Sequence, residues 1–568
     1  MKTEKDFLVC LITENFDGKT KEYAESAVNI TESDGVISFN ATIAERVKNC
    51  VIRFKINVET SMLYVHNERL ENFFDSGLRD DPESGESEYF LCIRSGEKYY
   101  NFAIGLPCKF KSKFKYRKTE DGYYIDFITE FPVSYSGVFR SETLLFSNKE
   151  STLALKKFIK EDRKEFEKPI GWSTWDYYFT DINEECVKEN TDFIAADKIL
   201  SEKVRYIAID DGWEQSEGHW REGAAFPKGL KNIVDYINEK GFIAGIWTCP
   251  VRLNTLCATV MRRNGFLIRD EYGDPIIYDG FYVLDPTHPD GEKFIRETFD
   301  YLNSCGFGFY KIDFISHILA GERFYDKTAG PFDVIRHLIE IIRSCVGDAH
   351  IMGCNMPYGV GFGYVDSKRV GLDIHNTYGH LVKCSEIYLP QFAAHDRVYR
   401  NDLDYLVVRG EETSFKDEYN VLNPTAGYWK THTPDKFVWR QGRDFSYNEA
   451  KMWCAMELIS GSSLFLGDRL SKLNGAGLDL VYKTMENADF ISGEPDDMFE
   501  SPLPSVWKKD GAVAVFNFSE EEKSFCVSGL KDERYKDVFS ERILSPNSGK
   551  AVIKLEPHDC VYMVVKNV

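Results

Sequence analysis

The strongest constraint on the fold is an alternation that runs from residue 169 to residue 478. Short apolar runs alternate there with amphipathic stretches of about a dozen residues, which predicts strands followed by helices. Strands and helices in this order build a parallel sheet, and eight such units predict an α/β fold, a (β/α)8 TIM barrel. The predicted strands are 170–175, 204–210, 242–248, 307–313, 350–354, 368–373, 404–408 and 463–466.

The regions on either side of the barrel carry a different pattern. In residues 1–152, apolar and polar residues alternate over short runs such as 51–58, separated by Gly, Asp and Ser. A period of two at hairpin spacing predicts an N-terminal antiparallel β-sandwich. The same period returns in 479–568, for example at 512–518, and predicts a small C-terminal antiparallel β-domain. The charged segment 153–168 is predicted to be a helical linker.

The composition favours a neutral small molecule as the partner. The net charge of −21 argues against nucleic acid, which is bound by a basic face. The 14 cysteines show no paired spacing, which predicts reduced thiols rather than disulfides or a zinc site. The first residues lack the layout of a signal peptide, and no run approaches ~18 apolar residues. We therefore expect a cytoplasmic protein with no membrane partner.

The fourth predicted strand ends in a lysine and an aspartate, Lys311 and Asp313. Catalytic side chains gather at the carboxyl edge of a barrel. Lys311 should keep Asp313 ionised, because a nearby cation favours the charged form of a carboxyl group. An ionised carboxylate at this edge is a candidate nucleophile. The alternatives are a structural ion pair and a helix N-cap.

The second predicted strand ends in two adjacent aspartates, Asp210 and Asp211, followed by Gly212 and Trp213. Adjacent carboxylates can accept hydrogen bonds from neighbouring sugar hydroxyls while an aromatic ring covers the apolar face of the sugar. A helix cap beside a surface acid is the alternative. A metal site is disfavoured, because no histidine stands close enough to help complete a shell of about four to six ligands.

Asp373 ends the sixth predicted strand, at the same edge as Asp313. Glycoside hydrolysis needs two carboxyl groups, of which one attacks or activates water and the other protonates the leaving oxygen. Asp366 is a competing choice for the acid, and a helix cap is a further interpretation of Asp373. A separation of about 5–5.5 Å would indicate retention and one of about 6.5–9.5 Å inversion, which the sequence leaves open.

Eight segments of the chain resemble, in the same order, those of the α-galactosidase families 27 and 36 of the glycoside hydrolases. The resemblance extends from about residue 168 to residue 568, where Leu555-Glu556-Pro557-His558 is similar to their terminal β-domain. The N-terminal sandwich agrees better with family 36, including its raffinose-synthase-like branch. The eight segments are 171–175, 209–213, 245–247, 311–313, 354–357, 369–374, 401–406 and 463–468.

The resemblance implies a retaining double displacement in which Asp313 is the nucleophile and Asp373 is the general acid and base. This chemistry needs no cofactor and no metal. The same matching implies the substrate-binding residues: Asp210 and Asp211 hold the C4 and C6 hydroxyls, Trp175 stacks on the sugar ring, Trp247 lines the site, and Lys311 and Arg369 reach hydroxyls near the nucleophile.

The chain departs from the family pattern in three places. Many family 27 members have Cys-Glu-Trp-Pro where this chain has Cys354-Asn355-Met356-Pro357. The resemblance implies that Asn355 faces the substituent at C2 of the sugar, and this departure leaves the identity of that substituent open. Those relatives pair this cysteine with one two residues past the nucleophile. Ile315 stands there, so Cys354 should be a free thiol. The loop 410–445 matches nothing in the family and is predicted to lie at the barrel rim, where its role is open.

These observations predict a retaining exo-α-galactosidase that hydrolyses terminal α-galactosides of small oligosaccharides. One alternative is a raffinose-synthase-like transglycosylase, in which a sugar hydroxyl replaces water. Another is a glycosidase for a related glycone, such as an α-N-acetylgalactosaminide or a β-L-arabinopyranoside. A third is a catalytically inactive carbohydrate-binding protein. The expected partner is a small oligosaccharide, and a homo-oligomer is an option because family 36 members are often oligomers.

Overall fold

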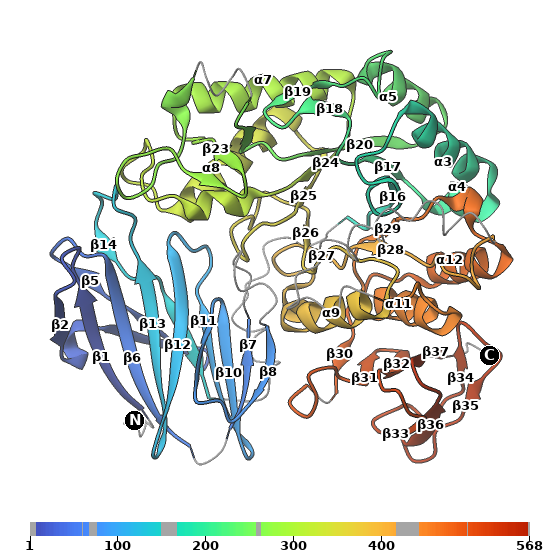
Figure 1. Ribbon diagram of the computed structural model, residues 1–568. Helices are drawn as coiled ribbons and strands as arrows, with labels where there is room; N and C mark the ends of the chain where they lie inside the picture. The colour runs from blue at the N-terminus through green and yellow to red at the C-terminus, as the bar shows by residue number, and fades with distance from the viewer. Residues whose placement is uncertain are drawn as a thin grey trace.

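The computed structural model of the chain describes residues 7–58, 61–66, 76–148, 167–256, 263–415, 442–496 and 498–565. The predicted linker helix falls almost wholly outside these residues, as does most of the predicted rim loop 410–445. Figure 1 shows antiparallel sheets at the N-terminal side, a parallel sheet with helices around it, and a smaller set of antiparallel strands at the C-terminal end. Within the described ranges, no helix is long and apolar enough to cross a membrane.

Nine parallel strands form the central sheet, in the order β27-β26-β25-β24-β20-β17-β16-β29-β28. Most of their residues are buried, as expected for a parallel sheet covered on both faces. The strands are β16 (Ile170–Ser173), β17 (Tyr206–Ile209), β20 (Ile243–Thr248), β24 (Phe309–Ile312), β25 (His350–Gly353), β26 (Ser367–Arg369), β27 (Arg400–Asp402), β28 (Tyr405–Leu406) and β29 (Leu464–Leu466).

The two edges of this sheet belong to one segment of the chain. β27 pairs with β26 and β28 pairs with β29, and only Leu403 and Asp404 separate β27 from β28. The sheet therefore curls until its edges meet. The seventh predicted strand, 404–408, is partly wrong: strand pairing begins at Arg400 and is interrupted at Asp404, which has a φ of 120° and a side chain that binds other groups.

Helices cover the outside of the curled sheet and begin and end at recognisable signals. Pro289 starts α7, and Gly306 ends it with a φ of 98°. Ser446 and Glu449 form a capping box at the start of α11. The α-helices of the described residues are α2 (Trp175–Tyr178), α3 (Glu184–Ala196), α4 (Lys198–Lys203), α5 (Leu230–Glu239), α7 (Pro289–Cys305), α8 (Pro331–Val346), α9 (Tyr378–Tyr388), α11 (Tyr447–Ser460) and α12 (Gly475–Asn487).

Besides the short pair of β5 (Thr42–Ile43) and β14 (Phe139–Arg140), two antiparallel sheets precede the curled parallel sheet, with orders β2-β1-β6-β13-β12-β9 and β3-β4-β15-β11-β10-β7-β8. Alternate residues of β6 are buried, as the period of two predicts. Their strands are β1 (Phe7–Glu14), β2 (Thr20–Tyr23), β3 (Asn29–Ser33), β4 (Val36–Asn40), β6 (Asn49–Asn57), β7 (Met62–Val65), β8 (Gly77–Asp80), β9 (Ser84–Ser87), β10 (Phe90–Ser95), β11 (Lys98–Ile104), β12 (Lys111–Thr119), β13 (Gly122–Glu130) and β15 (Leu144–Ser147).

The C-terminal strands are also antiparallel. One sheet has the order β30-β31-β32-β37-β34-β35, and β33 pairs with β36. Their bounds are β30 (Glu494–Pro495), β31 (Val506–Lys509), β32 (Ala512–Asn517), β33 (Lys523–Val527), β34 (Tyr535–Asp537), β35 (Ile543–Leu544), β36 (Ala551–Leu555) and β37 (Asp559–Val565).

The N-terminal sheets contact loops at the carboxyl edge of the barrel. Lys111 Nζ donates a hydrogen bond to the carbonyl of Leu319, at 3.0 Å, in the short 3-10 helix η3 (Ile315–Ala320) that follows β24. The ring of Tyr89 packs against that of Tyr358, in the loop after β25, with centroids 5.2 Å apart. These contacts hold the loops that carry the candidate site.

Candidate active site

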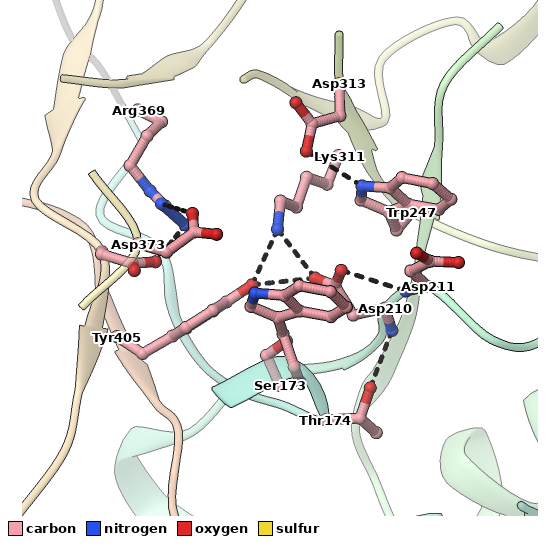
Figure 2. A network of polar contacts seen from close by, with 12 residues as sticks. Ser173, Thr174, Asp210, Asp211, Trp247, Lys311, Asp313, Arg369, Asp373 and Tyr405 are labelled. Atoms are coloured by element: carbon pink, nitrogen blue, oxygen red, sulfur yellow. Dashed lines mark hydrogen bonds and ion pairs between the residues drawn. The ribbon is translucent and has the colours of Figure 1, made fainter. Parts of the chain in front are cut away.

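The residues predicted from the sequence meet at the carboxyl edge of the curled sheet. In Figure 2, Lys311 lies at the centre of the group, Asp373 and Arg369 lie on one side of it, and Trp247 and Asp211 lie on the other. They come from different strands, because the carboxyl ends of parallel strands meet at one edge.

Lys311 is buried and binds Asp210. Its Nζ lies 2.9 Å from Asp210 Oδ2 and donates to Tyr405 Oη at 3.0 Å. Tyr405 Oη donates to the same Asp210 oxygen at 2.8 Å. The predicted pairing of Lys311 with Asp313 is therefore wrong: the lysine side chain crosses the interior to the carboxylate at the end of β17. Tyr405 was missed, although it lies within one of the eight segments quoted for the family.

Asp313 is held by three hydrogen-bond donors. Trp247 Nε1 donates to Oδ2 at 3.1 Å, and Oδ1 accepts from Asn355 Nδ2 at 2.9 Å and from the backbone N–H of Phe314 at 2.7 Å. Phe314 and Asn355 have φ values of 53° and 43°, in the left-handed region that is costly for residues other than glycine. Strained backbone of this kind is found preferentially at functional sites. The three donors fix the orientation of the carboxylate.

Asp373 follows β26 and has a side chain that is 48% exposed. Desolvation is the strongest single influence and opposes the ionised form, but the nearby charges of Arg369, Lys311 and His375 together outweigh it and lower the pKa of Asp373. Arg369 NH1 lies 2.9 Å from Asp373 Oδ1. The Trp175 side chain acts in the same direction on the pKa of Asp373. Asp373 is thus the carboxylate of the site that water reaches most easily.

Asp402 and Asp404 are two further site residues that sequence reasoning missed. Both are buried and both contact Arg369: Asp402 Oδ1 lies 3.3 Å from Arg369 Nε, and Asp404 Oδ1 contacts NH2. Asp404 Oδ2 also accepts from the backbone N–H of Ile374 at 2.6 Å. The signal was available, since both aspartates stand in the segment 401–406, but the sequence does not show which cation they face.

Asp211 and Glu214 differ from Asp210 in having no lysine against them. Burial and the neighbouring charge of Glu214 raise the pKa of Asp211 to about 8, and burial raises the pKa of Glu214. Glu214 opens the hairpin β18 (Glu214–Ser216) and β19 (His219–Glu222).

Behind Asp373, a buried network supports the aromatic wall of the site. Trp175 stacks on Phe179, with ring centroids 4.8 Å apart, and Phe179 stacks on His375 at 6.0 Å. His375 Nδ1 lies 2.8 Å from Asp176 Oδ1, and the other Asp176 oxygen lies 2.5 Å from Arg409. The ring of Trp175 is therefore held from behind by packed side chains.

Asp366, the competing choice for the acid, lies at the wrong end of β26. It directly precedes that strand, at the amino edge of the sheet. Its carboxylate binds Arg343 at 2.6 Å and accepts from the backbone N–H of Ile351 at 2.8 Å. These are structural contacts away from Asp313, so the alternative is wrong.

The cysteines that the structure describes are all free thiols, Cys354 among them. This confirms the expectation drawn from Ile315. Desolvation in the interior raises the pKa of the Cys354 thiol well above its ordinary value, which keeps it protonated.

Residues 138–327 match the family model described as Melibiase. The matched part includes Asp210, Asp211, Trp247, Lys311 and Asp313, and ends before Arg369 and Asp373. The α-galactosidase of Cyamopsis tetragonoloba is 34% identical over 96 residues, which are 15% of this chain and 23% of that protein. The chain thus aligns with less than a quarter of this curated relative's length.

Solved structures of α-galactosidases share the fold over most of the chain. TtGalA from Thermus thermophilus, in complex with stachyose, has a TM-score of 0.60 at 15% identity and covers 84% of this chain and 99% of its own. The GH36 α-galactosidase AgaA from Geobacillus stearothermophilus has a TM-score of 0.59 at 12% identity and covers 98% of this chain and 89% of its own. At these identities the likeness shows the fold.

Proposed function

We propose that the chain is a retaining exo-α-galactosidase that hydrolyses terminal α-galactosides of small oligosaccharides. In this proposal Asp313 attacks the anomeric carbon. Asp373 protonates the leaving oxygen and then removes a proton from the water that releases the sugar. The Melibiase match supports the reaction class.

The observation that carries the proposal is the contrast between the two carboxylates. Asp313 is buried, oriented by three donors and aimed from β24, as a nucleophile requires. Asp373 is half-exposed, so it can exchange protons with water. Figure 2 shows both turned toward the space around Lys311.

Arg369 connects sugar binding to the protonation of Asp373. In the free site Arg369 favours the ionised form of Asp373, which is the form a base needs and an acid cannot use. A sugar hydroxyl that binds the guanidinium would draw it away from Asp373, and the pKa of Asp373 would then rise. Asp402 and Asp404 keep the guanidinium in place during this exchange, because their contacts lie on the buried side.

The remaining residues form the proposed sugar site. Asp210, held by Lys311 and Tyr405, and Asp211 beside it would bind the C4 and C6 hydroxyls. Trp247 would line the site and Trp175 would stack on the ring. Asn355, which donates to Asp313, would face the substituent at C2, where an amide group suits a hydroxyl.

Several finer assignments are part of the same proposal. The AgaA likeness extends over the N-terminal sheets, which supports family 36 and the division into domains at 1–152, 169–478 and 479–568. Free thiols at the described cysteines support a cytoplasmic protein. Water rather than a sugar hydroxyl is proposed as the acceptor, and product analysis with an added acceptor sugar separates the two.

The test is hydrolysis of p-nitrophenyl α-D-galactopyranoside by the wild type and by Asp313→Asn, with the anomer released first followed by NMR. We expect the α-anomer from the wild type and a loss of at least about 10³-fold in kcat for the variant. Asp373→Ala should spare this activated substrate far more than a natural galactoside. Release of the β-anomer first, or equal losses on both substrates, would contradict the roles given to Asp313 and Asp373.

A further inference from the structure

The residue that follows the proposed nucleophile carries one of its three hydrogen-bond donors. The backbone N–H of Phe314 donates to Asp313 Oδ1 at 2.7 Å. Phe314 makes this bond with a φ of 53°, in the left-handed region. A residue with a β-carbon keeps such a conformation only where its surroundings hold it there. The contacts of the Phe314 side chain therefore bear on the position of Asp313.

The guanidinium of Arg252 lies between two phenyl rings. Its Cζ is 4.0 Å from the ring centroid of Phe314 and 3.7 Å from that of Phe281. Both distances are well inside the range of about 6 Å over which a cation is attracted to an aromatic face. The Arg252 side chain is 8% exposed, and the attraction is stronger where water is excluded. Arg252 therefore packs firmly against the ring of Phe314.

Stacking, rather than a hydrogen bond to a carboxylate, determines where this guanidinium lies. Arg252 Nε is buried and has no hydrogen-bond partner in the part of the chain that the structure describes. Oxygens of Glu217 and Asp279 lie 3.4 Å from Nε and 3.9 Å from NH2, so they supply opposite charge at distances too long for a good hydrogen bond. Arg409, by contrast, donates to Asp468 at 2.8 Å.

A small antiparallel sheet holds these side chains beside the nucleophile loop. β22 (Ile277–Tyr278) and β23 (Phe281–Val283) form a hairpin whose two turn residues have φ values of 49° and 82°, both left-handed. β21 (Arg252–Asn254) pairs with β23. In η3, His317 packs against the Phe314 ring in a T-shaped arrangement, with centroids 5.4 Å apart. Phe314 thus has a ring neighbour from its own loop and a stacked cation from another part of the chain.

We propose that Arg252 is a positioning residue: by stacking on Phe314 it keeps the Phe314 N–H directed at Asp313, and so keeps that carboxylate in place to attack the anomeric carbon. The inference deepens the proposed function and rests on it for the identity of the nucleophile. Arg252 acts through Phe314, so its removal should slow the attack and leave sugar binding almost unchanged. A misplacement of about 1 Å can cost about 10²-fold in rate.

The first test uses the ligand-free protein and does not depend on any activity. With phenylalanine labelled with ¹⁵N, and Phe314 assigned by the loss of its signal in Phe314→Leu, the wild-type amide proton should resonate downfield, because it donates to a carboxylate at 2.7 Å. In Arg252→Met the signal should move upfield, and its exchange with solvent should become at least about tenfold faster. Methionine fills the space of the arginine stem but has no charged plane to stack on the rings.

The matched control is Arg221→Met. Arg221 in β19 also stacks on an aromatic ring, with its Cζ 3.9 Å from the centroid of Tyr301, but that ring belongs to α7. The control removes the same kind of contact, and its Phe314 signal should match that of the wild type. A Phe314 signal that is unchanged in Arg252→Met, or that moves equally in both variants, would overturn the inference.

The second test compares rate with binding on p-nitrophenyl α-D-galactopyranoside. In Arg252→Met we expect kcat to fall about 10²-fold, while KM and the inhibition constant of D-galactose change by less than about threefold. A rise in KM and in the inhibition constant with an unchanged kcat would mean that Arg252 binds the sugar itself, and would overturn the positioning role.

Arg252→Lys keeps the test decisive if the methionine variant does not fold. Lysine keeps the charge but lacks the planar group that stacks between two rings. Its kcat should lie about tenfold below that of the wild type, and its Phe314 signal should lie between those of the wild type and Arg252→Met. A lysine variant with the kcat and the Phe314 signal of the wild type would show that the stacked plane is not needed.

The two tests separate this inference from the proposed function. If the Phe314 signal moves as expected but the wild type hydrolyses no α-galactoside, the proposed function fails, while the placement of Asp313 by Arg252 stands. If the wild type hydrolyses the galactoside and Asp313→Asn does not, but Arg252→Met keeps the wild-type kcat, the proposed function survives and the role of Arg252 is wrong.

Discussion

The two buried cations of the site, Lys311 and Arg369, are partnered in different ways. Lys311 contacts one carboxylate, Asp210, and the Tyr405 hydroxyl that bonds to the same oxygen. Arg369 contacts three carboxyl groups, of which Asp402 and Asp404 are buried and the third, Asp373, is half-exposed.

The difference shows which half of the site is fixed and which can change. Lys311 and Asp210 neutralise each other completely, so separating them would leave two bare charges in the interior. Arg369 has more carboxyl groups than its charge can neutralise. It can therefore exchange Asp373 for a sugar hydroxyl and remain compensated by Asp402 and Asp404. The fixed half suits recognition, and the adjustable half suits proton transfer.

The largest effect should come from Lys311→Met, which removes the cation of the buried ion pair between Lys311 and Asp210. Asp210 would be left buried without its cation, and removal of one partner of a buried pair costs about 3–5 kcal/mol. We expect that loss in the free energy of urea unfolding and at least about a 10³-fold fall in kcat/KM. A variant as stable as the wild type at pH 7 would show that the pair is not a fixed unit.

Arg369→Ala should have a smaller effect on stability, because Asp402 and Asp404 can take up protons when the guanidinium is absent. Desolvation raises the pKa of both. Its main effect should be on pH dependence. Arg369 lowers the pKa of Asp373, so its removal should raise that pKa and move the alkaline limb of kcat/KM to higher pH. The measurement is the pH profile with a poor leaving group.

If the alkaline limb of the kcat/KM profile lies at the same pH in Arg369→Ala as in the wild type, a group other than Asp373 supplies the proton to the leaving oxygen. Arg409→Ala is the matched control, because Arg409 is equally buried but pairs with Asp176 and Asp468 instead of Asp373. It should lower stability without moving the limb.

Tyr405→Phe should have the smallest effect of the three. It removes one hydroxyl that bonds to Asp210 and to Lys311, while the ion pair between them remains. Loss of one hydrogen bond to a charged group costs roughly 1.5–3 kcal/mol. We expect KM to rise about tenfold with a modest change in kcat. A loss as large as that of Lys311→Met would mean that Tyr405, and not the lysine, holds Asp210.

Much of the fold and the core of the site could be predicted from local pattern. The alternation of apolar runs and helices located eight of the nine strands of the central sheet to within a few residues and missed β27, because buried parallel strands leave a continuous apolar signal that the polar sequence Arg400-Asn401-Asp402 lacks. Polar residues at the strand ends marked Asp210, Lys311, Asp313 and Asp373 in the same way, whereas Arg369 was indicated by the family resemblance. The predicted strands were too long where those residues, Asp210 and Asp313 among them, turn to bind other groups instead of continuing the ladder.

The sequence did not predict which charged side chains from different strands contact each other. The sequence places Lys311 two residues from Asp313, yet its Nζ lies against Asp210, which is 101 residues away. Asp366 was a competing choice for the acid until the structure showed its carboxylate bound to Arg343 and to the backbone N–H of Ile351. Asp402 and Asp404 surround Arg369 only because the curled sheet brings β27 beside β26.

The sequence by itself determined the type and order of the elements, and which residues stand at the ends of the strands, because burial and periodicity act on near neighbours. Only the tertiary structure decided which charged side chains contact each other. The curling of the parallel sheet determines which side chains form ion pairs and hydrogen bonds. It brings together residues that lie far apart in the sequence, and no sequence pattern predicts those pairs. The two adjacent aspartates thus have different surroundings, because Lys311 binds Asp210, whereas burial and the charge of Glu214 raise the pKa of Asp211.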